Sequence, residues 1–245
     1  MSQTKGLEVR IGRFRFRLTL VPTLVTVPAV LAMLGLGTWQ VERLEWKREL
    51  IASRTAHVTA PPIALPEAGA DGAELEFHRV RLTGAFLHDR EMYLGARSLN
   101  GNVGYHVVTP LERDDGSHVL VDRGWVPLER KAPETRPLGQ LQGQVTVEGV
   151  IRTGGRKGRF VPDNVPEENF WFYVDVAAMA AHAGLGALPP FYVEAAAADV
   201  PGGLPIGGQA RINIPNDHLE YAITWYALAL ALVVIYLLYH RVKED

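Results

Sequence analysis

The sequence contains no cysteine. This absence excludes disulfide bonds, thiolate metal sites, covalent attachment of a c-type haem and cysteine nucleophiles. It does not identify the cellular compartment, because many exported proteins also lack cysteine. A large charge excess is missing as well. The formal net charge is −2 at pH 7, which gives no support for a nucleic-acid partner.

The sequence also lacks the common catalytic and nucleotide-binding motifs. H-E-x-x-H, G-x-S-x-G, the P-loop pattern and G-x-G-x-x-G are all absent. Several histidines are scattered without the spacing of metal ligands: His57, His78, His88, His106, His118 and His182. We therefore expect that the chain is not an enzyme.

Two long uncharged segments predict membrane-spanning helices. The first runs from Leu18 to Gly37, and the second runs from Tyr221 to Tyr239 with aromatic residues near both of its ends. A helix of about 20 residues spans roughly 30 Å, the thickness of a bilayer's hydrocarbon core. We predict transmembrane helices at residues 18–38 and 217–239.

Each segment has an alternative interpretation. The first follows a basic leader and resembles a cleaved signal peptide, but its apolar run is longer than usual and no clear cleavage site follows. The second resembles a buried core helix, but its length and the basic residues after it, Arg241 and Lys243, favour a membrane span.

Basic residues at both ends predict the orientation. Arg10, Arg13, Arg15 and Arg17 precede the first span, and two further cations follow the second. The positive-inside rule then places tails 1–17 and 240–245 in the cytoplasm, and the domain at 39–216 in the periplasm. The short basic tail favours a bacterial plasma membrane. The alternative is the mitochondrial inner membrane, with tails in the matrix and the domain in the intermembrane space.

The central region has the pattern of a β-rich domain. Apolar runs separated by turn residues predict strands at 77–87, 91–96, 105–111, 118–125, 145–152 and 191–194. The residues from Asp114 to Ser117 predict a hairpin turn, and residues 174–183 predict a short helix. We expect the first span to continue as a helix over residues 39–51, followed by a loop at 57–73.

The predicted fold class is a membrane α+β protein. Two terminal transmembrane helices flank an extracytoplasmic domain with short helices. Its runs of strands with few helices indicate a mainly antiparallel, barrel-like sheet.

The start of the second apolar segment combines a helix-start pattern with a histidine. Asp217 is the expected N-cap and Glu220 closes a capping box, so His218 takes the first helical position. Three residues share the helix face of His218: Tyr221, Ala222 and Trp225. An imidazole at the membrane surface can ligate haem iron through a neutral nitrogen. The alternative is an interfacial histidine that bonds a lipid headgroup or a backbone carbonyl.

Five blocks of residues carry a resemblance to a known family. They are Gly37-Thr-Trp39-Gln40 with Arg43 and Lys47; Gly104-Tyr105 before Thr109-Pro110; Val119-Leu-Val-Asp122-Arg123-Gly124-Trp125-Val-Pro127; Asn164-Val-Pro166 with Asn169, Trp171 and Asp175; and Asn216-Asp217-His218-Leu219 with Tyr221, Ala222, Thr224 and Trp225. In this order, between two apolar ends, the blocks resemble the surfeit locus protein 1 family over roughly residues 35–240. One departure is Asn-Asp-His-Leu-Glu where the family usually has Asn-Asn-His-Leu-Gln.

The resemblance implies an assembly factor for haem-copper cytochrome c oxidase. Bacterial members of this family are thought to bind haem a and to assist its delivery to catalytic subunit I. The implied partners are subunit I, haem a synthase and membrane lipid, with no nucleic acid. The resemblance also implies that His218 is the axial ligand of the haem iron. The alternative is an accessory or adaptor protein that stabilises subunit I or the mature oxidase without binding haem.

Further residues are candidates for the haem site. Tyr221 and Trp225, with lipid, would hold the apolar ring while the propionates face water. Trp39, Gln40 and Arg43 lie at the predicted depth of His218, and they either complete a pocket or pack the two helices together. Arg123 either pairs with a haem propionate or has a structural role.

Overall fold

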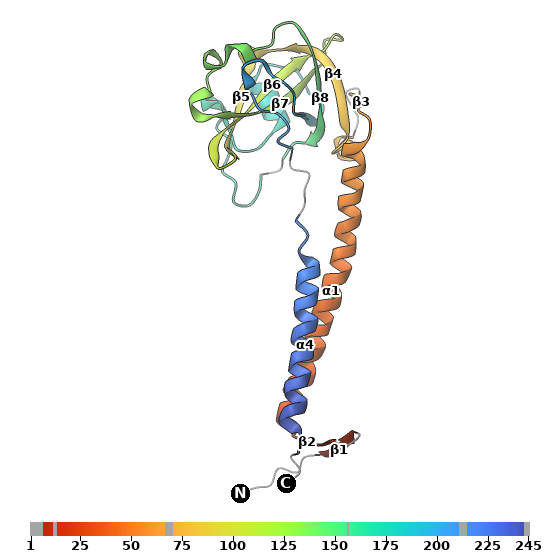
Figure 1. Cartoon of the computed structure of the whole chain (residues 1–245). Helices are drawn as coiled ribbons and strands as arrows, with labels where there is room; N and C mark the ends of the chain where they lie inside the picture. The colour runs from red at the N-terminus through yellow and green to blue at the C-terminus, as the bar shows by residue number, and fades with distance from the viewer. Residues whose placement is uncertain (1–6, 12–13, 67–70, 156, 211–214, 243–245) are drawn as a thin grey trace. The chain divides into compact units, whose positions relative to one another are not determined.

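The computed structural model describes residues 7–11, 14–66, 71–155, 157–210 and 215–242 (Figure 1). The chain divides into two compact units. The first comprises residues 1–52 and 213–245, and we call it the helix pair. The second comprises residues 53–212, and we call it the sheet domain.

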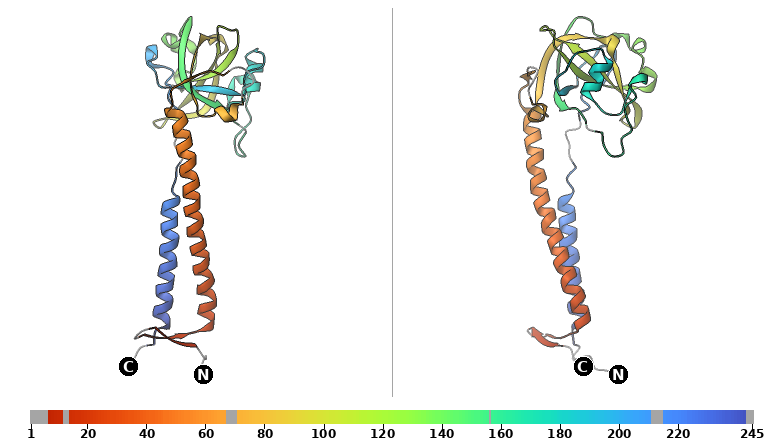
Figure 2. Two further views of the ribbon diagram at one scale, coloured as in Figure 1. Left: turned by 90° about the vertical axis from the view of Figure 1, so that its right-hand side faces the viewer. Right: turned by 180° about the vertical axis from the view of Figure 1, so that it is seen from behind.

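The helix pair contains the two apolar segments. Helix α1 runs from Leu20 to Thr59, and helix α4 runs from His218 to His240. Within this unit the two helices run side by side in opposite directions (Figure 2). Both are long and apolar enough, by length and composition, to cross a membrane. The predicted continuation of the first helix over residues 39–51 is confirmed, because α1 is unbroken through this segment and ends at Thr59.

Small residues let the two helices approach closely. A Cβ atom added to Gly37 would lie 2.7 Å from Cε1 of Tyr226, so glycine is required there. On α4, Ala222 and Ala229 are buried and occupy the same helix face, seven residues apart. Close approach of this kind increases van der Waals contact, which favours helix association in an apolar solvent.

Polar side chains link the helices along their length. The bonded pairs are Thr19 Oγ1 with His240 Nε2 at 2.9 Å, Thr23 Oγ1 with Tyr236 Oη at 2.5 Å, and Thr38 Oγ1 with Tyr226 Oη at 3.2 Å. His240 Nδ1 also bonds the carbonyl of Tyr236 at 2.9 Å, so both ring nitrogens of this buried histidine have partners. These contacts fix the register of the antiparallel pair.

A short hairpin precedes α1. Strand β1 (Leu7–Ile11) pairs antiparallel with β2 (Phe14–Leu18). The segment that follows α4 adds to it, because Val242 N–H donates to the carbonyl of Arg15 at 2.9 Å. We expected only a basic tail here. The alternation of aromatic and basic residues in Phe-Arg-Phe-Arg-Leu was a strand pattern that the sequence did contain.

Within the described residues, the sheet domain forms an eight-stranded sheet. The strands are β3 (Ile63–Ala64), β4 (Arg79–Phe86), β5 (Met92–Leu99), β6 (Asn102–Glu112), β7 (His118–Pro127), β8 (Gln144–Thr153), β9 (Phe170–Trp171) and β10 (Phe191–Ala195). Their order is β3-β4-β8-β10-β7-β6-β5-β9, and β4 also pairs with β6. The six strands expected from sequence are all confirmed.

The sheet is mixed: most of its described pairings are antiparallel, as expected, and three short pairings are parallel. Strand β10 lies between β8 and β7, antiparallel to the first and parallel to the second. The short strands β3 and β9 pair in parallel with β4 and β5. The antiparallel expectation holds for the hairpin partners β5, β6 and β7, where adjacent strands are joined by short turns. It also holds for β8, which pairs antiparallel with both β4 and β10.

Among the described residues the sheet domain has three apolar clusters, and the two largest lie on opposite faces of β7. Val119 and Val121 belong to a cluster with Phe191, whereas Leu120 belongs to a cluster with Trp171. Successive strand residues point to opposite faces, so β7 is buried on both sides. This two-sided burial positions the polar residues that follow in the same strand.

Short helices complete the domain. They are α2 (Gly72–Leu75), α3 (Val176–His182) and 3₁₀ turns at His88–Arg90, Leu128–Arg130, Pro133–Thr135, Pro137–Gly139, Pro166–Glu168 and Pro201–Gly203. The predicted hairpin turn is confirmed, because Gly116 N–H donates to the Arg113 carbonyl at 2.9 Å. The expected loop at 57–73 is wrong in part, since it contains the end of α1, β3 and the start of α2; residues 67–70 lie outside the described residues.

Candidate functional site

The predicted histidine lies at the end of the helix pair. His218 is the first residue of α4, as expected, and its Nδ1 lies 2.6 Å from Oε1 of Gln40 on α1. Gln40 is 9% exposed and shares a buried helix face with Gly37 and Leu44. The prediction that Gln40 and His218 lie at the same depth is therefore confirmed.

This hydrogen bond selects one form of the imidazole ring. The carbonyl oxygen of a glutamine side chain only accepts hydrogen bonds, so Nδ1 of His218 is the donor. In the neutral ring the proton is then on Nδ1, and Nε2 keeps its lone pair. None of the described residues hydrogen-bonds Nε2 of His218 in this structure. The side chain is thus oriented by one nitrogen and has the other available as a ligand.

The capping box expected at this helix start is not formed. Asp217 precedes the helix, but its backbone, at φ −94° and ψ 8°, is not extended and its side chain makes no capping bond. An N-cap side chain reaches the first turn most readily from an extended backbone. The carbonyl of Asp217 instead accepts the N–H of Tyr221 at 3.2 Å. His218 is therefore held by Gln40 rather than by a capping box.

The other aromatic and basic candidates lie in the same end of α1 and α4 and are wholly or partly exposed. Trp39 is 52% exposed and Tyr221 is 56% exposed, whereas Trp225 is half-buried. The guanidinium of Arg43 lies 3.8 Å from the ring centroid of Trp46, one turn further along α1. The site thus presents apolar rings and one cation at the surface of the helix pair.

Arg123 belongs to the interior of the sheet domain. Its guanidinium is 5% exposed, donates to Glu91 Oε1 at 3.0 Å and to the Gly139 carbonyl, and lies 3.3 Å from His88 Nδ1. Arg136 donates to the other Glu91 oxygen at 2.5 Å. These contacts engage both terminal nitrogens of Arg123 with groups of the protein itself. The geometry therefore favours the structural alternative, and we leave Arg123 out of the candidate haem site.

This buried cluster sets the charge of Glu91. Burial by itself raises the pKa of the Glu91 carboxyl, but the hydrogen bonds from His88 and Arg136 and the charges of Arg136 and Arg123 outweigh it. Together they lower this pKa from 4.5 to about 2. Glu91 therefore stays ionised near neutral pH and offsets part of the charge of the two buried arginines.

The fold and the site together define a sheet-rich domain carried between two terminal apolar helices, with a histidine at the start of the second helix. The sequence model of the SURF1 family matches residues 27–230 of the chain. The chain belongs to the SURF1 family.

Relatives from several organisms support this assignment. A SURF1-like protein of Monosiga brevicollis is 41% identical over 229 residues, which cover 89% of this chain and 86% of the relative. Surfeit locus protein 1 of Takifugu rubripes is 40% identical over 225 residues, covering 85% and 91%. Surfeit locus protein 1 of Homo sapiens is 40% identical over 214 residues, covering 80% and 70%. The likeness thus extends over most of both chains in each case.

Proposed function

We propose that this chain is a membrane-anchored assembly factor for cytochrome c oxidase that carries haem a to catalytic subunit I. Family membership supports the assembly role in general. The contact between Gln40 and His218 is the observation that carries the haem-binding part. In this proposal haem a is cargo, and the protein is a carrier rather than an enzyme.

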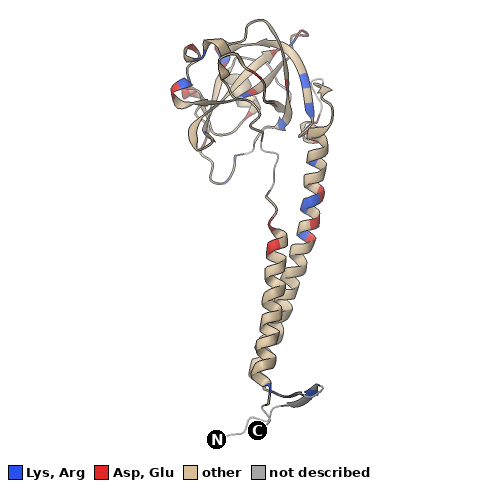
Figure 3. Cartoon of the chain, in the orientation of Figure 1, with Lys and Arg blue, Asp and Glu red and all other residues tan. Residues whose placement is uncertain are grey.

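The surface of the helix pair supports the membrane anchor. Large apolar side chains face outward along both helices, including Leu20 at 74%, Leu31 at 63% and Leu230 at 65% exposure. A core helix of a water-soluble protein would bury these side chains, whereas a bilayer solvates them. Charged residues gather toward the ends of the pair and leave its middle uncharged (Figure 3).

The distribution of basic residues supports the proposed orientation. Arg15, Arg17 and Arg241 lie at the end of the pair where α1 begins and α4 ends. By the positive-inside rule this end faces the cytoplasm, or the matrix of a mitochondrion. The end that carries His218 then faces the periplasm or the intermembrane space. A bacterial plasma membrane and the mitochondrial inner membrane both fit this arrangement.

The strand pairings support a barrel-like sheet domain. The pairings β4-β8-β10-β7-β6 form a closed run, because β6 also pairs with β4.

The donor chemistry of the site fits haem. A neutral imidazole whose Nδ1 donates a hydrogen bond is the usual axial ligand of haem iron, because the second-shell acceptor fixes the ring and raises the basicity of Nε2. Gln40 is that acceptor here, and its neutral amide increases the basicity less than a carboxylate would. A single ligand of moderate strength suits a carrier, because the haem must leave again.

The neighbouring residues have matching roles in the proposal. The exposed rings of Trp39 and Tyr221, with Trp225 and lipid, cover the faces and edges of the apolar macrocycle. Arg43 is the cation of this set, and its guanidinium suits a haem propionate. Subunit I is the proposed acceptor of the haem and haem a synthase its proposed donor.

The absorption spectrum of the purified protein tests the proposal. The full chain is purified in detergent from cells that make haem a, next to His218→Ala. We expect a haem a spectrum that the substitution removes, while the thermal unfolding of the sheet domain stays unchanged. A colourless protein that still co-purifies with subunit I would replace the carrier by an adaptor. A colourless protein that does not co-purify would contradict both roles.

A further inference from the structure

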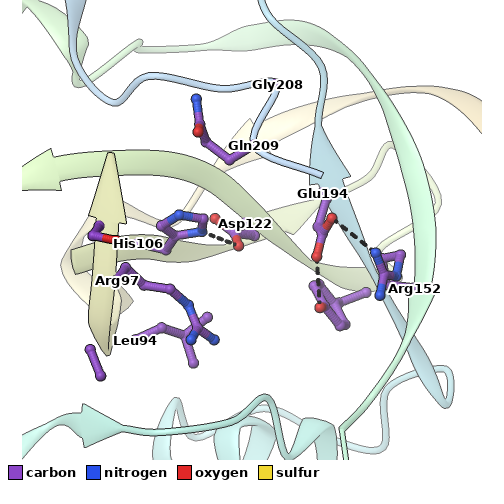
Figure 4. A pocket seen from close by; sticks show the side chains of 11 residues that line it. Leu94, Arg97, His106, Asp122, Arg152, Glu194, Gly208 and Gln209 are labelled. Atoms are coloured by element: carbon purple, nitrogen blue, oxygen red, sulfur yellow. Dashed lines mark hydrogen bonds and ion pairs between the residues drawn. The ribbon is translucent and has the colours of Figure 1, made fainter. Parts of the chain in front are cut away.

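A polar cavity of about 520 Å³ lies in the sheet domain (Figure 4). Its lining comes from β5, β6, β7, β8 and β10 and from the loop after β10, and it includes Arg97, His106, Asp122, Arg152, Glu194 and Gln209. The volume lies within the range of roughly 300–1,000 Å³ typical of small-molecule sites. Polar groups from five strands converge on it, which the packing of the core does not require.

One wall of the cavity is an oriented histidine. Nδ1 of His106 lies 2.8 Å from Oδ2 of Asp122, and Oδ1 of Asp122 accepts the N–H of Gly124 at 3.0 Å. Asp122 is buried, and its carboxylate accepts a hydrogen bond from the N–H at Nδ1 of His106. Nε2 of His106 is therefore free of this pairing, and the ring is held at the cavity wall (Figure 4).

The opposite wall of the cavity carries an ion pair between Arg152 and Glu194, whose opposite charges compensate each other. Arg152 lies 3.4 Å from Oε2 of Glu194 and 3.7 Å from Oε1 of Glu76. The hydroxyl of Tyr192 donates to Oε1 of Glu194 at 3.0 Å. Burial raises the pKa of Glu194 although the charge of Arg152 opposes this, so a further donor from a ligand would stabilise its ionised form. On the loop, Gln209 Nε2 donates to Gly207, which leaves Oε1 as an acceptor.

Arg97 is the cation of this cavity that lacks a compensating charge. Among the described residues its side chain has no hydrogen bond or ion pair, and it lines the cavity beside Leu94 and His106 (Figure 4). A β-bulge between Leu94 and Arg97, with Ala96 at φ 53°, breaks the regular alternation of β5. Bulges of this kind redirect a side chain and are common next to binding sites.

We propose that this cavity binds a small organic acid. Its carboxylate pairs with the planar fork of Arg97, and its hydroxyl or amine donates to Glu194 and Gln209. An arginine fork recognises a carboxylate through two parallel hydrogen bonds. A metal ion is a poorer match, because no group of three His, Cys, Asp or Glu within the described residues is arranged to hold one. The inference does not depend on the proposed haem site.

Calorimetric titration of the full chain in detergent tests the inference with three probes. They are L-malate, which carries carboxylates and a hydroxyl; succinate, which lacks the hydroxyl; and inorganic phosphate. We expect saturable binding of malate, weaker binding of succinate and the weakest binding of phosphate. Arg97→Ala should weaken malate binding by at least about tenfold, because it removes a charge-assisted bidentate contact. Arg97→Lys keeps the positive charge but lacks the planar fork, so its malate affinity should lie between those of the unmodified chain and Arg97→Ala.

Arg159→Ala is the matched control, since it removes an exposed cation outside this cavity. Its malate binding should equal that of the unmodified chain, and thermal unfolding identifies any variant that fails to fold. If Arg97→Ala does not fold, Arg97→Lys provides the comparison. Absence of saturable binding for all three probes would overturn the inference. Equal binding by the unmodified chain and the folded Arg97 variant would also overturn it, and tighter binding of phosphate than of malate would overturn the assignment to organic acids.

Discussion

Gln40 Oε1 accepts a hydrogen bond from His218 Nδ1 at 2.6 Å, and this contact joins two helices across 178 positions of sequence. It lies at the end of the pair where α4 begins, next to the buried residues Gly37 and Ala222. The helix pair therefore does more than anchor the chain in the proposed function. It sets the orientation and the protonated nitrogen of the candidate haem ligand.

Replacing Gln40 should weaken haem binding without removing the ligand. Gln40→Ala takes away the acceptor, so the ring of His218 loses its fixed orientation and tautomer. Loss of a second-shell partner typically costs about 10–100-fold in metal affinity, and we expect a loss near the lower end for a neutral amide. The measurement is a haem a titration of the purified chain followed by absorption. Thr38→Val is the control, because it removes the hydroxyl contacts to Tyr226 at 3.2 Å and to the Leu34 carbonyl at 3.0 Å in the same helix pair but leaves the contact between Gln40 and His218 in place. Equal affinity of Gln40→Ala and Thr38→Val would contradict the positioning role.

Substitutions at two glycines of α1 distinguish the effect of close helix packing from the effect of helix propensity. Gly37→Val places a side chain against Tyr226, where a Cβ already lies 2.7 Å from Cε1, whereas Gly35→Val meets no atom within 4 Å. We expect Gly37→Val to destabilise the helix pair by about 1–3 kcal/mol, the usual cost of overpacking. Gly35→Val should leave stability nearly unchanged. Thermal unfolding of the two variants in detergent, followed by circular dichroism, makes the comparison. Similar melting of both variants would show that the helices do not pack through Gly37.

The buried cluster around Glu91 should dominate the stability of the sheet domain. Glu91→Gln leaves the charges of Arg123 and Arg136 without their counter-ion in a buried site, and breaking such pairs costs about 3–5 kcal/mol. Glu148→Gln is the matched control, because its partners Arg79 and Arg81 are partly exposed and such pairs contribute about 0–1 kcal/mol. Chemical denaturation of the full chain, followed by tryptophan fluorescence, measures both. A similar small effect of the two substitutions would exclude a central role for the cluster.

The lowered pKa of Glu91 predicts a specific dependence of the stability of the sheet domain on pH. The pKa of Glu91 falls from 4.5 to about 2 on folding, so its contribution is complete above the higher value and is lost as pH drops toward the lower one. The stability difference between the unmodified chain and Glu91→Gln should therefore be constant above about pH 5 and should narrow between about pH 5 and pH 2. Denaturation curves across this range test the point. A difference that stays constant down to pH 2 would contradict the lowered pKa.

Local patterns in the sequence predicted the helices and strands of this protein better than they predicted which strands pair with each other. The apolar segments, the six main strands and the first helical position of His218 follow from hydrophobic period and turn residues within a short window. Strand β10 illustrates the limit. Its residues predict a strand, but nothing local indicates that it lies between β8 and β7 and is parallel to one of them.

The candidate sites show the same division. His218 was identifiable from its position at a helix start, and Gln40 from its depth at the end of the first span. The role of Arg123 could not be identified from the sequence, because its partners Glu91 and Gly139 are brought to it by tertiary packing. The polar cavity was missed for the same reason, since its walls come from five strands. The β1–β2 hairpin, in contrast, was overlooked although its alternating pattern was present in the sequence.

Chemical rescue of a glycine variant tests ligation by His218 most directly. The full chain carrying His218→Gly is purified in detergent, mixed with haem a, and examined by absorption and resonance Raman spectroscopy with and without free imidazole. The account predicts that the variant lacks the iron–histidine signature of the unmodified chain and that added imidazole restores it. A variant that shows the unmodified spectrum without imidazole would contradict ligation by His218.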